Sequence, residues 1–264
     1  MTPVLVADGP RPLLAGTPTR LIVALALALG ASSAIVLAGA LPPPALGVAG
    51  IVAGHGALMA TALAWAGLPV GTSGVAIGLV ALGAVAASVH PMGAVAYLAL
   101  PAWIHALARS GRLGKLGLDV PSPPGALLIG VVVGLGLGAH LLVSATLTFG
   151  YRLGVEPQRY LGAVLYDAGV QVLATELFFR GALFNRAQRR WPLGRALLLA
   201  VGATLVRYLV DPLLPRSADA VLGMTFYVSL LATASGWLFW RFGTPVPGMV
   251  AGLGFFAAYR ALAR

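Results

Sequence analysis

The stretch "VLATELFFRGALFNRAQRR", residues 172–190, decides the fold class, because it is an apolar segment that carries one internal acid–base pair and ends in arginines. The whole chain is strongly apolar: 59% of its 264 residues are hydrophobic, 9% are charged, and the mean hydropathy is +0.93. Lipid offers no hydrogen bonds to an exposed backbone, so apolar runs of roughly 20 residues are expected to form helices. The sequence therefore predicts an all-α fold, a polytopic transmembrane bundle of about eight or nine helices in a lipid bilayer.

Nine apolar segments are predicted as membrane spans, and proline-rich breaks or short loops separate them. The predicted spans are residues 21–41, 48–69, 74–90, 93–108, 124–149, 160–185, 196–214, 220–240 and 245–262. The third, fourth and last of these are short for a bilayer. The sequence therefore leaves three alternatives for these segments: they tilt in the membrane, they re-enter it, or their boundaries are wrongly placed.

The chain divides into three parts by composition. These are a polar N-terminal tail (1–20), N-terminal transmembrane helices (21–120) and a C-terminal transmembrane domain (121–264). In the last part, Gly130, Gly134 and Gly138 recur at four-residue intervals. Such spacing puts small residues on one helix face, so we expect another helix to pack closely there.

The net charge of +10 comes mainly from basic residues in the segments between apolar runs. Two clusters stand out: Arg109, Arg112 and Lys115 after the fourth span, and Arg186, Arg189, Arg190 and Arg195 after the sixth. A cytoplasmic N-terminus followed by nine spans puts both clusters inside, in agreement with the positive-inside rule. We interpret them as signals of membrane orientation and expect no nucleic-acid partner. Arg260 would then lie outside, which argues against complete crossing by the last span.

Charged residues inside the spans predict a polar site. Each costs roughly 2.5 to 3.5 kcal/mol at the bilayer centre, so such residues should face one another or a cavity. Glu176 and Arg180 are four residues apart on one helix face, and Arg207 and Asp211 repeat this spacing on the next span. Asp167 lies nearly half a turn from the Glu176 face. We expect Glu176 to accept hydrogen bonds from Arg180 and Arg207, which would join the sixth and seventh helices.

The segment "TELFFRGALF" resembles the first signature of the CAAX protease and bacteriocin-processing family, which includes the type II CAAX prenyl endopeptidases. That signature is two adjacent glutamates, three residues and an arginine, commonly followed by glycine; Glu176, Arg180 and Gly181 match its second glutamate, arginine and glycine. The resemblance covers roughly residues 124–262, so residues 121–264 are expected to form a CAAX-protease-like domain. It implies an intramembrane endopeptidase, here in the bacterial inner membrane. In the family a glutamate activates water, while histidines and an asparagine on later helices orient that water, bind a metal or stabilise the oxyanion.

The sequence departs from the family where the chemistry is performed. Thr175 stands in place of the first glutamate, which the family uses as general base, and a hydroxyl cannot take up a proton near neutral pH. Arg207 stands at about the position of the histidine in the second signature. In the last span, Gly252 and Phe256 stand where a histidine and an asparagine or aspartate are expected. Glu176 is therefore the carboxylate left as a candidate catalytic residue, with Arg180 beside it.

Histidines and cysteines give no support for a metal site. The chain has no cysteine, which excludes disulfides, a thiol nucleophile and thiolate ligands. Its four histidines lie on four different predicted spans, without the paired spacing of a helical metal site: His55, His90, His105 and His140. We interpret them as residues that hydrogen-bond between helices, with His90 at a turn before Pro91. No metal and no other cofactor is expected.

Three functions fit these observations. The favoured one is a catalytically degenerate family member that acts as a membrane-embedded binding or accessory subunit, with a membrane protein or a hydrophobic peptide as partner. The alternative is an active intramembrane endopeptidase that uses Glu176 itself as base. A transporter is the third hypothesis, because charges within spans can mark a permeation path.

Overall fold

The computed structural model describes residues 42–154, 156–209 and 217–263, together with residues 19, 21–23, 26, 27, 30, 34, 38 and 39. Most of the polar tail, most of the predicted span 21–41, and Asp211 with its predicted pairing to Arg207 lie outside the described residues. The described chain is helical almost throughout, so the all-α prediction is confirmed. The exception is a short antiparallel pairing of β1 (Arg152–Leu153) with β2 (Leu262–Ala263).

The helices follow one another with short connections. In chain order they are α2 (Pro43–Trp65), α3 (Val70–Val89), η1 (Pro91–Leu98), α4 (Ala99–Arg109), η2 (Gly114–Leu116), α5 (Pro124–Phe149), α6 (Pro157–Tyr166), η3 (Asp167–Gln171), α7 (Val172–Glu176), η4 (Leu177–Phe184), α8 (Asn185–Ala187), α9 (Leu193–Leu209), α10 (Ala218–Phe242) and α11 (Val246–Arg260).

Prolines and glycines set several of these boundaries. Pro91, Pro124 and Pro157 stand at the first helical position, where the missing N–H would have had no partner within the helix. Gly150 and Gly243 end α5 and α10 in the left-handed conformation, with φ of 69° and 73°. Glycine adopts that conformation without the steric cost that other residues meet.

Six helices in the described part of the chain are long and apolar enough to cross a membrane. The third and fourth predicted spans are longer than the sequence pattern indicated, because α3 has 20 residues and η1 continues into α4 as one helix of 19. By contrast, α9 and α11 have 17 and 15 residues. At 1.5 Å per residue, α11 is about 22 Å long and shorter than the roughly 30 Å hydrocarbon core. The expectation of a short last helix is confirmed.

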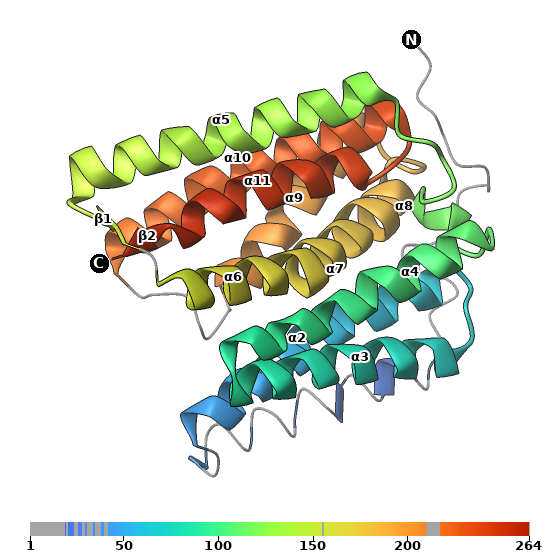
Figure 1. Cartoon of the computed structure of the whole chain (residues 1–264). Helices are drawn as coiled ribbons and strands as arrows, with labels where there is room; N and C mark the ends of the chain where they lie inside the picture. Colours follow the sequence, from blue (N-terminus) through green and yellow to red (C-terminus); the bar gives the residue numbers. More distant parts are fainter. Residues whose placement is uncertain are drawn as a thin grey trace.

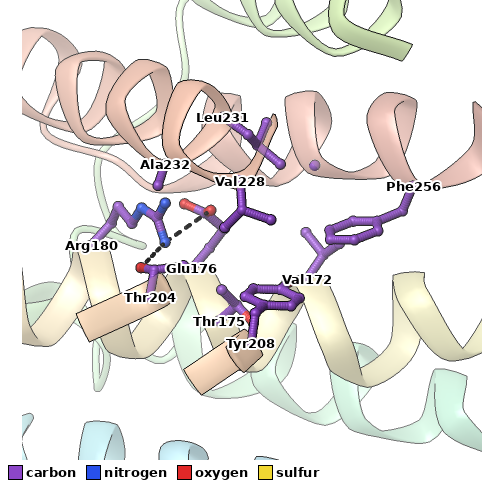
Figure 2. A pocket seen from close by; sticks show the side chains of 11 residues that line it. Val172, Thr175, Glu176, Arg180, Thr204, Tyr208, Val228, Leu231, Ala232 and Phe256 are labelled. Atoms are coloured by element: carbon purple, nitrogen blue, oxygen red, sulfur yellow. Dashed lines mark hydrogen bonds and ion pairs between the residues drawn. The ribbon is translucent and has the colours of Figure 1, made fainter. Parts of the chain in front are cut away.

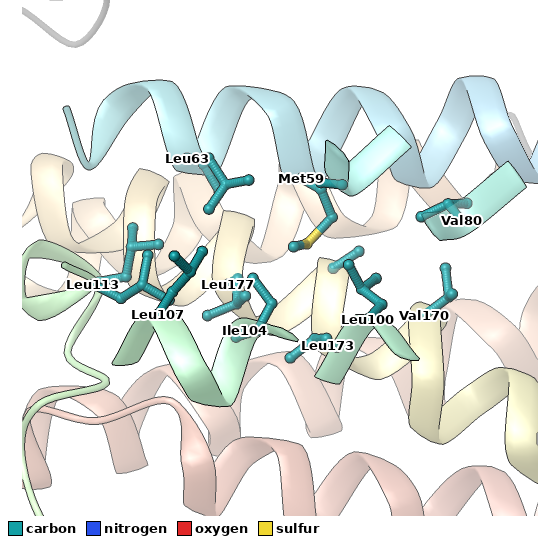
Figure 3. Packing of buried hydrophobic residues seen from close by; sticks show 14 of the residues in the cluster. Met59, Leu63, Val80, Leu100, Ile104, Leu107, Leu113, Val170, Leu173 and Leu177 are labelled. Atoms are coloured by element: carbon teal, nitrogen blue, oxygen red, sulfur yellow. The ribbon is translucent and has the colours of Figure 1, made fainter. Parts of the chain in front are cut away.

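The helix from Pro157 to Ala187, called the central helix below, lies between two groups of helices (Figure 1). On one side it shares a hydrophobic core with α2, α3 and α4, in which Met59, Leu100 and Leu177 are completely buried (Figure 3). On the other side it packs against α9, α10 and α11. Half of its apolar stretch is buried, the largest share among the six candidate spans. Polar residues on this helix are therefore held away from lipid.

The glycine stripe of α5 packs directly against α11. A Cβ atom on Gly130 or Gly134 would collide with the backbone oxygens of Pro247 and Ala251, and one on Gly138 would lie 2.7 Å from the Ala258 Cβ. The predicted close approach is thus confirmed, with α11 as the partner helix. On another side α11 packs against Val172 of the central helix, and this contact brings its residues to the site.

Candidate functional site

The candidate site lies on the continuous helix from Pro157 to Ala187. Two of its parts, η3 and η4, are π-helical, and such insertions occur frequently at functional sites. Glu176 is the last residue of α7, and Arg180 lies within η4. The predicted acid–base pair therefore spans a change of helix type.

Glu176 and Arg180 form a buried ion pair. Arg180 Nη1 lies 3.5 Å from Glu176 Oε1, and the two side chains are 2% and 5% exposed. The same Nη1 donates to Thr204 Oγ1 at 3.4 Å, and that hydroxyl donates to the Ala200 carbonyl of α9 at 2.7 Å (Figure 2). The predicted pairing is confirmed, and the link between the central helix and α9 runs through Arg180.

The predicted contact between Glu176 and Arg207 is wrong. The Arg207 guanidinium points towards α2, where its Nη2 would lie 3.2 Å from a Cβ on Gly54. Thr204 and Tyr208 turn towards the ion pair instead. Arg207 is about 100° from Tyr208 around the helix, and its side chain extends towards α2.

A small cavity lies beside the ion pair (Figure 2). Thr175 and Glu176 line it from the central helix, and Thr204 and Tyr208 line it from α9. The space has room for about one water molecule. The hydroxyls of Thr204 and Tyr208 were missed in the sequence, although their four-residue spacing on an apolar helix is a signal that could have found them.

The far side of the cavity is formed by α10 and α11. Gly252 and Phe256 of α11 line it, and α10 contributes aliphatic side chains. Thr175, Glu176 and Gly252, which occupy positions of the family's catalytic groups in the resemblance, come together at the cavity, whereas Arg207 lies elsewhere. The later helices thus gather around the glutamate as the resemblance implies.

Three buried polar atoms near the cavity have no hydrogen-bond partner among the described residues: Glu176 Oε2, Arg180 Nε and Ser235 Oγ. Two of them converge on Gly248, since a Cβ there would lie 2.6 Å from Glu176 Oε2 and 3.1 Å from Ser235 Oγ. Buried polar atoms are normally paired with protein or ordered water. Both atoms lie in a closely packed corner, where even a Cβ on Gly248 would collide with Glu176 Oε2. Nothing in the sequence pattern singled out Ser235.

The histidines do not line this cavity, and three of the four bond as predicted between or at the ends of helices. His55 Nε2 is 3.4 Å from the Tyr166 hydroxyl, His140 Nδ1 is 2.7 Å from the Tyr227 hydroxyl, and His90 caps η1 by accepting from the Met92 N–H. His105 is exposed on α4.

The residues of the site do not fit a metal ion. No group of three or more His, Cys, Asp or Glu side chains comes together among the residues that the structure describes. The cavity offers a single carboxylate, Glu176, with the Arg180 guanidinium beside it. A cation there would be repelled by the arginine and would lack ligands.

A second buried ion pair on the central helix was missed. Arg260, at the end of α11, donates from Nε and Nη2 to the two carboxylate oxygens of Asp167, both at 2.8 Å. Asp167 therefore joins the central helix to α11. The sequence pattern gave no sign that the Arg260 guanidinium reaches Asp167 at the start of η3.

Comparison with known proteins agrees with the sequence resemblance. Residues 157–255 match the family model described as type II CAAX prenyl endopeptidase Rce1-like. The match begins with the central helix and ends within α11. It includes all the cavity-lining residues named above except Phe256. No curated protein matches the chain, and no solved structure matches it. The chain is thus an integral membrane protein whose central and C-terminal helices resemble this family.

Proposed function

We propose that the protein is a catalytically degenerate relative of the CAAX prenyl endopeptidases that serves as a membrane-embedded binding or accessory subunit, in the bacterial inner membrane. In this proposal residues 121–264 form the CAAX-protease-like domain, and the helices within 21–120 form an N-terminal bundle packed against it. One observation carries the proposal. The cavity around Glu176 is lined by Thr175, Gly252 and Phe256 at the positions where the resemblance calls for water-activating groups.

Hydrolysis of a peptide needs a base for the water and donors for the developing oxyanion. Among the described residues that line the cavity, Glu176 is the one carboxylate, and none is a histidine, asparagine or glutamine. One oxygen of Glu176 already faces Arg180. A water held here would therefore lack the imidazole and amide groups that orient it in the family.

The small size of the cavity also supports a binding role over peptide cleavage. It has room for about one water molecule, whereas a peptide substrate needs space for several side chains and an extended backbone. The binding surface of a subunit of this kind would lie on its lipid-facing helices. Large apolar side chains are exposed along α5, including Leu128, Val132 and Leu147. A partner's transmembrane helix or a hydrophobic peptide suits such a surface.

Peptide cleavage tests the loss of chemistry. A prenylated CAAX-type peptide and a bacteriocin leader peptide would be incubated with the purified protein and with Glu176→Gln in lipid nanodiscs. We expect neither protein to cleave either peptide above a protein-free blank. Cleavage by the wild type that falls at least about tenfold in Glu176→Gln would overturn the proposal, since a lost base costs about 10² to 10⁴ in rate.

One observation favours the alternative of an active endopeptidase. Glu176 Oε2 is buried, has no partner among the described residues and adjoins a space of about one water. Glu176 would then act as general base through that oxygen, with Arg180 and Tyr208 near enough to the cavity to meet a substrate carbonyl. The same cleavage assay decides between the two functions.

The subunit role makes a separate prediction about association. Affinity-tagged protein, expressed at its native level and extracted in mild detergent, is expected to co-purify with one specific membrane protein. The test variant is Leu128→Ala with Val132→Ala, which keeps the lipid-facing side of α5 apolar but removes the large side chains, and it should retain less of that partner. A protein that always isolates alone would count against the role.

A further inference from the structure

Two basic loops meet at one end of the helical bundle. The Asn185 side-chain amide at the start of α8 donates to the Lys115 carbonyl at 2.9 Å, which joins the segment after α4 to the end of the central helix. Next to it, Arg186 donates to the Trp65 carbonyl at 3.2 Å and lies 4.3 Å over the Trp65 ring. Figure 1 shows α8 beside the segment that follows α4, at the end where α2 finishes. The clusters after the fourth and sixth predicted spans therefore lie on the same side of the membrane.

We call this region the basic end. Its basic residues come from the loops after α4 and α8, the start of α9 and the end of α10: Arg109, Arg112, Lys115, Arg186, Arg189, Arg190, Arg195 and Arg241. Asp119 is the one acidic residue in these segments, out of seven in the chain. At the opposite end, charges of both signs mix, as in the ion pair of Arg159 with Glu156 at 2.8 Å. The imbalance is therefore specific to one end.

Part of this positive charge has an internal role. Arg186, and Lys115 near Gly67, lie beside the end of α2, where carbonyl groups carry partial negative charge. Arg112 and Arg190 are exposed, and the structure gives them no ion pair with any described acid. Trp191 follows Arg190 and is 37% exposed. Tryptophan beside arginine is typical of the headgroup level of a membrane.

We propose that the basic end binds the phosphate groups of anionic phospholipids in the leaflet on that side. The helices that carry it cross the membrane, so its arginines stand at headgroup depth and meet lipid phosphates before any soluble ligand. The positive-inside rule puts the same end in the cytoplasm, where anionic lipids attract basic segments. An acidic protein partner is the competing occupant, but the membrane-level tryptophan favours lipid. This inference does not depend on the proposed function.

Lipid titration in detergent tests the inference. Purified full-length protein would be mixed with phosphatidylglycerol or phosphatidylcholine, and bound lipid counted by native mass spectrometry. The test variant is Arg112→Gln with Arg190→Gln, and the matched control is Arg152→Gln with Arg159→Gln, two exposed arginines at the opposite end. Each basic residue near an anionic surface is worth about a fivefold change in affinity, so the test variant should bind phosphatidylglycerol about 25-fold more weakly.

The expected result is that wild type and control retain phosphatidylglycerol in preference to phosphatidylcholine, and that added salt weakens this preference. Equal binding of the two lipids, or equal loss in test and control variants, overturns the proposal. Full competition by inorganic phosphate at millimolar concentration would also overturn it, because the ligand would then be a free anion. If the test variant instead loses a co-purifying acidic protein while its lipid binding is unchanged, the occupant is that protein and the lipid assignment fails.

Discussion

Two buried ion pairs on the central helix differ in how completely they are satisfied. Asp167 meets Arg260 through two hydrogen bonds of 2.8 Å, which use both carboxylate oxygens. Glu176 meets Arg180 at 3.5 Å through one oxygen, and Glu176 Oε2 and Arg180 Nε have no partner among the described residues. The first pair is closed, and the second is open towards a cavity.

Under the proposed function, this difference separates a purely structural contact from the remnant of a site. A bidentate arginine–carboxylate pair gains both geometry and charge-assisted hydrogen bonds, so Asp167 and Arg260 need nothing else. The Glu176 pair retains an unused acceptor that faces Gly248 and Ser235. Under the proposed function, the role left to Glu176 and Arg180 is to brace the helices around them.

Breaking the closed pair should have the largest effect. Asp167→Ala leaves Arg260 without its carboxylate at a position where the acid is 2% exposed. The Arg260 side chain is 27% exposed and stays partly hydrated, so the cost comes from the loss of two hydrogen bonds between charged groups, at about 1.5 to 3 kcal/mol each. Thermal unfolding in detergent should show a marked fall in melting temperature. The matched control is Glu156→Ala, from an exposed pair worth about 0 to 1 kcal/mol; equal shifts in the two variants would contradict the comparison.

Breaking the open pair should cost less. Glu176→Ala strands the buried Arg180, but the pair is long and Arg180 keeps its bond to Thr204, so we expect a loss of about 1 to 3 kcal/mol. The same unfolding assay measures it. An unchanged melting temperature would show that Glu176 does not brace the bundle.

Filling the corner beside the open pair should have the smallest effect. In Gly248→Ala the new Cβ would stand 2.6 Å from Glu176 Oε2 and 3.1 Å from Ser235 Oγ, so both must shift, at a cost of about 1 to 2 kcal/mol. The control is Gly136→Ala on α5, where nothing lies within 4 Å of the added atom and helix propensity predicts a gain of up to about 1 kcal/mol. If the melting temperature of Gly248→Ala changes as in the control, Glu176 Oε2 and Ser235 Oγ do not lie against Gly248.

Much of the fold could be predicted from the sequence because lipid permits few backbone structures. Apolar length, proline breaks and the glycine stripe at Gly130, Gly134 and Gly138 gave the helices and one close packing contact. Helix lengths were less predictable. The predicted break near Pro91 is confirmed, but the span that follows is longer than predicted, because Pro91 itself stands at the start of a helix of 19 residues, where proline is tolerated.

The site could be predicted only where its partners share one helix. Glu176 and Arg180 have a fixed four-residue spacing, so their pairing follows from the sequence. Asp167 and Arg260 are far apart in the chain, and their contact depends on how α11 packs. The orientation of Arg207 depended on the rotation of α9, which no local pattern fixes.

The most direct test of the account is a thermodynamic cycle on the open pair. Unfolding would be measured for Glu176→Ala, Arg180→Ala and the double variant. If the two residues act chiefly on each other, the double variant loses clearly less stability than the sum of the single variants, by about 1 kcal/mol or more. Strictly additive losses would contradict the account, because the contribution of Glu176 to stability would then not depend on Arg180.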